Sequence, residues 1–174
     1  MIEGIALALM KTLATYLFKN YILMQSQVKI EGAPKWYMQN VSSQVCVYDH
    51  QTGGMEAVDN AKAATYPKME KELSNILEAV IYENYSDLKD PKEKEFVMMF
   101  KDDPDANIFV RKTMSFPGIE YKKKSQSAFV KACIQKDAII KYQEKRSETI
   151  KYELTHNRAN SAFDELEDGD MKLQ

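Results

Sequence analysis

Histidine is the side chain most often used for proton transfer near neutral pH, and this chain of 174 residues has only two, His50 and His156. His50 lies in the turn-forming stretch DHQTGG, and His156 lies in a late, charged stretch. Neither has a serine or cysteine beside it in the pattern of an activated nucleophile. We therefore expect two ordinary surface histidines and a protein that is not an enzyme, with no catalytic residues.

The two cysteines, Cys46 and Cys133, stand far apart in the sequence and form no CxxC motif. Their spacing therefore predicts neither a zinc site nor a dithiol redox centre. Each lies among apolar residues, and free cysteine is among the most often buried residue types. We favour two small buried residues. Pairing in an oxidising compartment is the alternative, and the sequence leaves it open.

Two short stretches resemble ligand-binding loops. Asp102, Asp103 and Asp105 supply oxygen ligands of the kind that bind calcium, but the glycine and terminal glutamate of an EF-hand loop are missing. Gly53 and Gly54 precede a helical pattern, as glycines do in phosphate-binding loops, yet no GxGxxG or GK[ST] motif accompanies them. We expect a solvated aspartate turn and a flexible helix entry, with no metal and no cofactor.

Lys122, Lys123 and Lys124 form the densest basic patch, in a polar stretch that we place at the tip of a hairpin. They could contact anionic lipid or an acidic partner, but lysines at such a tip more often keep it soluble. The net charge is −2 and the isoelectric point is near 5.8. This balance gives no overall basic field, so we expect no nucleic acid partner.

The only tryptophan, Trp36, lies in the stretch APKWYMQN, after Pro34 and before Tyr37. Aromatic rings collect at membrane interfaces, so Trp36 and Tyr37 could follow a membrane anchor. In the other interpretation Pro34 stiffens the entry into the fold and Trp36 closes the core, where a large aromatic side chain buries much area. We favour the second interpretation, with Pro34 at the start of the folded module.

Residues 2–24 are the most apolar stretch, but Lys11 and Lys19 interrupt it before any uncharged run reaches the roughly 18 to 20 residues of a membrane span. Small and basic residues fall on one side of a helical wheel and larger apolar residues on the other, which predicts an amphipathic helix. The opening MIEG and the lack of an A-x-A site argue against a cleaved signal. The helix either anchors the protein at a membrane or packs on its own domain or a partner.

The hydropathy pattern predicts an α+β fold: a small antiparallel β-sheet of about three strands packed against two long helices, preceded by an N-terminal amphipathic or anchoring helix. We expect strands over 41–48, 108–116 and 127–134, with a bend or bulge at Pro117-Gly118. One long helix covers 55–85 and kinks or restarts at Pro67, and another begins near Asp137. The predicted divisions are an N-terminal anchor or amphipathic helix, an α+β module and an acidic tail that frays, over residues 1–30, 31–163 and 164–174.

The order PKWY, strand, Gly-Gly, alanine-containing helix, hairpin and SAFVKACIQKDAIIKYQ resembles the twenty-kilodalton lipoprotein (Lpp) family of epsilonproteobacteria, over residues 33–145. That family includes secreted and outer-membrane antigens and a flagellar basal-disk protein. The resemblance implies an α+β module that oligomerises or docks into periplasmic assemblies. This chain departs from the family in having no lipobox cysteine before Cys46 and in having Pro67 within the helix, which puts lipidation in doubt.

The resemblance leads us to expect a non-catalytic, membrane-tethered periplasmic structural protein, a scaffold component of a flagellar-motor disk or a related envelope assembly. Its expected partners are envelope or flagellar-motor proteins, copies of itself, and the inner membrane through residues 1–24, with the N-terminal helix uncleaved. The alternative is a secreted or surface-associated binding protein, such as an adhesin-like or immunogenic antigen. The residues that we expect to be structural or to contact partners are Pro34, Trp36, Tyr37, Gly53, Gly54, Gly118, Lys122, Lys123 and Lys124.

Overall fold

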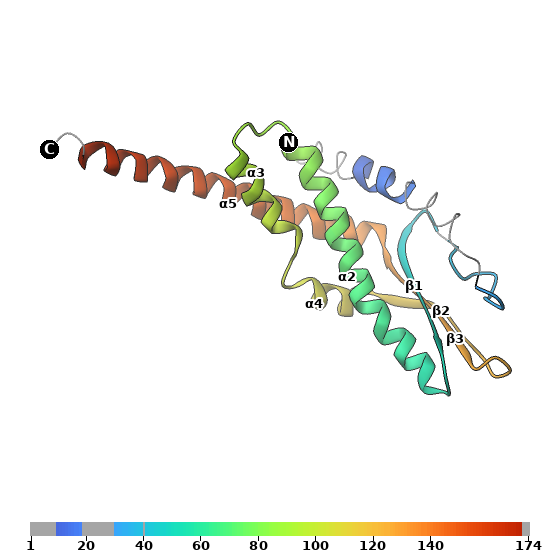
Figure 1. Cartoon of the computed structure of the whole chain (residues 1–174). Coiled ribbons are helices and arrows are strands. Elements are labelled where there is room, and N and C mark those ends of the chain that lie inside the picture. The colour runs from blue at the N-terminus through green and yellow to red at the C-terminus, as the bar shows by residue number, and fades with distance from the viewer. Residues whose placement is uncertain (1–9, 19–29, 40, 172–174) are drawn as a thin grey trace.

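The structure is a computed structural model, and it describes residues 10–18, 30–39 and 41–171. Residues 10–18 are helical. The elements that follow (Figure 1) are β1 (Gln44–Thr52), α2 (Glu56–Tyr85), α3 (Pro91–Met98), the 3-10 helix η1 (Met99–Lys101), α4 (Ala106–Thr113), β2 (Ser115–Lys122), β3 (Ser127–Gln135) and α5 (Lys136–Met171).

The three strands form one antiparallel sheet in the order β1-β3-β2, so β3 is the central strand. β2 and β3 form the predicted hairpin, and the register of their pairing shifts between Ser115 and Gly118, where we expected a bend or bulge. β1 begins and ends a few residues later than predicted, because its pairing with β3 continues to Thr52, opposite Ser127. The α+β class and the three-stranded antiparallel sheet are confirmed.

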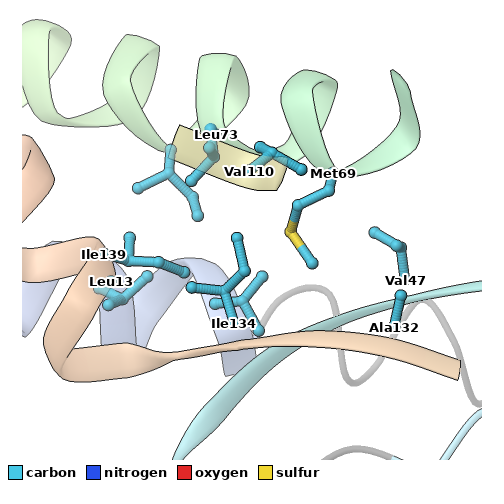
Figure 2. Close-up of a cluster of buried hydrophobic side chains, with 10 residues drawn as sticks. Leu13, Val47, Met69, Leu73, Val110, Ala132, Ile134 and Ile139 are labelled. Carbon is cyan, nitrogen blue, oxygen red and sulfur yellow. The ribbon is translucent and has the colours of Figure 1, made fainter. Parts of the chain in front are cut away.

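One face of the sheet, the inner face, packs against α2 and holds the main hydrophobic core. Val47 of β1 and Ile134 of β3 point toward Met69 and Leu73 of α2, as Figure 2 shows. Met69 and Leu73 are four residues apart, so they lie on the same side of the helix. The apolar spacing in the sequence therefore determines which side of α2 covers the sheet.

An ion pair between a partly exposed lysine and a buried carboxylate also joins α2 to β1. The side chain of Asp49 is 7% exposed, and its carboxylate accepts a hydrogen bond of 2.5 Å from Lys68 Nζ. The same ammonium group donates to the backbone carbonyl of Tyr48 at 2.8 Å. Burying a carboxylate without a partner costs folding free energy. The ammonium group of Lys68 offsets that cost for Asp49.

The described part of the N-terminal stretch packs against this domain. Leu13 is 2% exposed and belongs to the main core, whereas Lys11 is exposed, as the amphipathic pattern predicts. For residues 10–18, packing on the chain's own domain is therefore the observed role of the buried side. The rest of the expected anchor, residues 1–9 and 19–29, lies outside the described residues.

The predicted strand over 108–116 is wrong over most of its length, because α4 occupies Ala106–Thr113. The N–H groups of Ile108 and Phe109 donate to the backbone carbonyl of Asp105, so the aspartate turn starts a helix. Val110 is fully buried, whereas Ile108, which a strand would place on the same face, is 62% exposed. A short apolar run fits both the helical and the strand period, and here tertiary packing selects the helix.

Both long helices continue where the sequence suggested a break. α2 runs through Pro67, so of the two expected alternatives, a kink or a restart, the restart is wrong. Pro67 and Ala63 are both exposed, so water can bond to the Ala63 carbonyl that the proline leaves without a donor. α5 continues to Met171. The prediction that the chain frays from residue 164 is therefore wrong for residues 164–171.

A second hydrophobic cluster holds the helices together beyond the sheet. α5 starts directly after β3, and its middle part packs on α2 and α3. The buried members of the cluster are Leu77 and Ile81 of α2, Val97 of α3, and Ile150 and Leu154 of α5. α2 therefore has two roles, because one part of it covers the sheet and another part supports α5.

Candidate partner-binding site

The outer face of the sheet points away from α2 and is crossed by residues 30–39. In Figure 1 the sheet lies between α2 and this segment. The segment is held in a turn by the N–H of Tyr37, which donates to the Pro34 carbonyl at 3.0 Å, and Pro34 is buried. The strand residues of the outer face are Cys46, Tyr48, His50, Gly118, Glu120, Phe129, Lys131 and Cys133.

Trp36 lies directly over Gly118 of β2. A Cβ atom added at Gly118 would come within 2.7 Å of the indole ring, which is closer than side chains approach. Glycine is therefore required there because the ring occupies the space. Trp36 is half-buried and makes an edge contact with Tyr37, with 6.1 Å between ring centroids. The tryptophan thus packs on the folded module, on the outer face of the sheet and not in the main core.

Tyr37 joins the segment to the centre of the outer face. Its ring makes edge contacts with Tyr48 and Phe129, at centroid distances of 5.5 and 5.2 Å. Such edge-to-face pairs stabilise beyond the area they bury. Burial, and secondarily the negative charge of Asp49, raises the pKa of Tyr37 to about 12. Burial likewise raises the pKa of Tyr48.

The backbone carbonyl of Gln39 accepts hydrogen bonds from two outer-face side chains, the hydroxyl of Tyr48 and the ammonium group of Lys131. Lys131 is 7% exposed, and its Nζ lies 2.7 Å from that carbonyl oxygen. Burial lowers the pKa of Lys131. Burying a charged lysine without a hydrogen-bond acceptor costs folding free energy. The Gln39 carbonyl of the crossing segment supplies that acceptor for Lys131 in the central strand.

Cys46 and Cys133 form a disulfide between β1 and β3. They are directly opposite each other in the ladder, with 4.1 Å between their Cα atoms. Burial of both residues agrees with the sequence analysis, but the favoured interpretation as two separate thiols is wrong in this structure. The disulfide lies next to Tyr37 and Met38 of the crossing segment and closes that end of the outer face.

Gly53 and Gly54 form the turn between β1 and α2, beside the end of the hairpin. The N–H of Gly53 donates to the Gln126 carbonyl at 2.8 Å, and the hydroxyl of Tyr121 donates to the Gly53 carbonyl at 2.9 Å. Gly53 has a φ of +144°, which residues with a Cβ rarely adopt. The Gly54 N–H donates to the Glu56 carboxylate at 2.8 Å. These glycines serve the turn and the helix entry, as we expected.

The three lysines at the hairpin differ in their surroundings. Lys122 is half-buried, and its ammonium group donates to the Gly32 carbonyl and lies 3.6 Å from the Glu120 carboxylate. Lys123 and Lys124 are exposed. Lys122 therefore holds the crossing segment to the hairpin, while Lys123 and Lys124 are exposed in the turn at its tip.

The structure thus brings Pro34, Trp36, Tyr37, Gly118 and Lys122 together on the outer face and places the other four predicted residues at its end. Sequence reasoning missed Tyr48, Phe129 and Lys131 as members of this site. Alternation along SAFVKACI was the available signal, because it puts Phe129, Lys131 and Cys133 on one side of the strand.

The aspartate turn is less solvated than expected. The side chain of Asp103 is 8% exposed, accepts a hydrogen bond from the Tyr142 hydroxyl and lies 3.5 Å from Arg146 Nε. Burial and this hydrogen bond raise the pKa of Tyr142. Asp102 accepts a hydrogen bond from Ser74 at 2.7 Å, and both aspartates line an open cavity of about 470 Å³. These contacts attach the turn to α2 and α5.

Within residues 10–18, 30–39 and 41–171, no group of three or more histidine, cysteine, aspartate or glutamate side chains is arranged to hold a metal ion. No protein family model and no curated protein matches the sequence. The resemblance of residues 33–145 to the Lpp family therefore stays a prediction from the sequence. The outer face combines aromatic rings, a buried cation and a disulfide, and these groups pack the segment over residues 30–39 on the sheet.

Removing the disulfide should destabilise the domain. We expect the variant with Cys46→Ala and Cys133→Ala to lose about 2 to 5 kcal/mol of unfolding free energy, because the cross-link restricts the unfolded chain. Urea unfolding followed by circular dichroism measures this loss. Dithiothreitol should shift the wild-type curve toward that of the variant and leave the variant unchanged. Equal stability of the wild type with and without reductant would contradict the pairing.

The contact between Trp36 and Gly118 can be tested by a double-mutant cycle. Gly118→Ala should cost about 1 to 3 kcal/mol, because the new methyl group overlaps the indole ring. Trp36→Ala removes the overlap, so Gly118→Ala should cost clearly less in that background. Since Trp36 is the only tryptophan, its fluorescence reports directly on the displaced ring. Additive effects of the two changes would show that the residues do not touch.

The raised tyrosine pKa values predict loss of stability in base. The unfolded chain releases tyrosine protons near pH 10, while folded Tyr37 keeps its proton to about pH 12, so the unfolding free energy falls as pH rises across this range. Tyr37→Phe should make that fall shallower in urea titrations at pH 9, 10 and 11. Tyr82→Phe, at a side chain that is 76% exposed, is the matched control. An identical pH slope in wild type and Tyr37→Phe would contradict the assignment.

Proposed function

We propose that this protein is a non-catalytic structural component of the periplasm, a scaffold module of a flagellar-motor disk or a related envelope assembly. The compartment is inferred from the disulfide, and the type of assembly is inferred from the resemblance to the Lpp family. In this proposal α2 and α5 are the two long helices of an Lpp-like module over residues 31–163.

The observation that carries the proposal is the Cys46–Cys133 disulfide inside the sheet. Structural disulfides form and persist in oxidising compartments such as the bacterial periplasm and are rare in the reducing cytosol. The two cysteines are directly opposite each other on adjacent strands, so the disulfide is part of the sheet itself. A location in the cell envelope supplies the oxidising environment in which such a disulfide persists.

The surfaces of the module support a role in binding other proteins. Lys123 and Lys124 are exposed at the hairpin tip, and Trp36 is partly exposed on the outer face of the sheet. Aromatic side chains such as that of Trp36 are enriched at protein interfaces. β1 and β2 are both edge strands of the sheet and offer backbone groups for strand addition.

A tether to the inner membrane through an uncleaved N-terminal helix is part of this proposal. On the outward side of residues 10–18, Met10 is 47% exposed and Phe18 is 64% exposed, with Lys11 beside them. Apolar side chains flanked by a cation are typical of helices that lie at a membrane surface. In the described part of the chain, no helix has the length and apolar character needed to cross a bilayer.

The location can be tested in the native bacterium by fractionation and alkylation. We expect the full-length chain with the periplasmic or inner-membrane fraction, and two alkyl groups added to its cysteines only after reduction, as measured by intact mass. Cytoplasmic and periplasmic marker proteins control the fractionation. A reduced protein in the cytosol would contradict the proposal.

The motor assignment needs a separate experiment. A deletion strain should lose motility or lack periplasmic density around the motor in electron cryotomograms, and expression of the wild-type chain should restore both. Normal motility with an unchanged motor image would rule out that assembly. A secreted or surface-associated binding protein is the second candidate, because the disulfide suits it equally, and a truncated chain in the culture medium would favour it.

A further inference from the structure

The disulfide is buried beneath the crossing segment, residues 30–39. Cys133 is 1% exposed and Cys46 is 7% exposed. In the described part of the chain, the side chains that pack with the two cysteines on the outer face are those of Tyr48, Tyr37 and Met38. Tyr48 belongs to β1 itself, so the crossing segment supplies the two side chains that cover the bond from outside the sheet.

Reduction of a disulfide requires access to one of its sulfur atoms. A thiolate attacks one sulfur and displaces the other, so the rate depends on whether the attacking sulfur can reach the bond. The main core and α2 occupy the inner face of the sheet, and the disulfide lies on the outer face. A thiol must therefore approach from the side on which the crossing segment lies.

The crossing segment is attached to the hairpin by contacts that are separate from the disulfide. Trp36 lies over Gly118, and the ammonium group of Lys122 donates to the Gly32 carbonyl. Gly118 and Lys122 belong to β2, whereas the disulfide joins β1 to β3. A change at Trp36 or Lys122 therefore weakens the hold on the segment and leaves the two cysteines and their strands intact.

The part of the segment next to the disulfide has a strained backbone. Met38 has a φ of +63°, in the left-handed region that residues with a Cβ rarely adopt. Such a residue costs free energy and stays in place only when neighbouring contacts hold it. The carbonyl of the next residue, Gln39, accepts hydrogen bonds from Lys131 and Tyr48. The covering position thus depends on its contacts, and loss of one of them favours opening.

We propose that the crossing segment is a lid that controls how fast thiols reach the Cys46–Cys133 disulfide. Thiols react when the lid opens locally while the sheet and helices stay folded. Local opening of this kind needs less free energy than unfolding of the whole domain. The proposal concerns the purified chain, so its test is independent of the proposed function and of the cellular location.

The reaction behind the lid is ordinary thiol–disulfide exchange with a dithiol. Cys46 is the more exposed cysteine and lies in an edge strand, so its sulfur is the one attacked first. The thiolate of the reductant bonds to Cys46 Sγ, the bond between the cysteines breaks, and Cys133 leaves as a thiolate that takes a proton from water. The second thiol of the reductant then displaces Cys46, which is protonated in turn, and the reductant becomes a disulfide.

The rate of reduction by dithiothreitol in native buffer tests the lid. Samples of the full-length protein are quenched with N-ethylmaleimide, and intact mass counts the alkylated cysteines. Trp36→Ala should be reduced roughly tenfold faster than wild type, because a weaker hold raises the population of the open lid. Lys122→Ala should also be faster, whereas Lys123→Ala, at the neighbouring exposed lysine, should match the wild type. In guanidinium chloride all these proteins should be reduced at one rate.

A core variant separates opening of the lid from unfolding of the domain. Ile150→Ala, in the second hydrophobic cluster, should lower the unfolding free energy and leave the rate of reduction in native buffer near that of wild type. Circular dichroism and urea unfolding give the folded state and the stability of each variant, and Lys122→Ala decides the test if Trp36→Ala does not fold. Acceleration by Ile150→Ala equal to that by the lid variants, or no acceleration by the lid variants, would overturn the proposal.

Discussion

Burial of the central strand on both of its faces is the constraint on which the rest of this structure depends. All residues of β3 except the last are buried. A strand of this kind needs a cover on each side, and the two covers come from different parts of the chain: α2 on the inner face, and residues 30–39 on the outer face. The small side chains Ala128 and Ala132 let α2 lie close to the strand. The candidate site is a consequence of the second cover.

The outer cover is stabilised by specific polar contacts as well as by packing. Lys131 interrupts an otherwise apolar strand, and the Gln39 carbonyl satisfies its charge. Lys122 makes an equivalent contact with the carbonyl of Gly32, near the other end of the same segment. Between these anchors, Trp36 and Tyr37 pack on β2 and on the central strand. A short segment without regular secondary structure is thereby attached to the sheet at both ends and in its middle.

α5 has an inner part that packs on the domain and an outer part that is exposed. Ile150 and Leu154 join the inner part to α2 and α3, whereas residues 155–166 are all exposed. The helix as a whole therefore has no single apolar face, because only its inner part carries a packed side.

The sequence by itself determined the elements with a long or regular pattern: the α+β class, the β2–β3 hairpin, the irregular pairing near Gly118, and the apolar sides of α2 and of residues 10–18. Local pattern was sufficient there because each signal repeats over several residues. Only the tertiary structure decided that residues 108–113 are helical, that Cys46 faces Cys133, and that Lys131 has an acceptor in Gln39. The helix over residues 108–113 depends on which buried residues a short apolar run packs against. The disulfide depends on the register between β1 and β3, and the acceptor for Lys131 depends on the segment that covers the outer face of β3. These are contacts between residues far apart in the chain, and a one-dimensional pattern does not contain them.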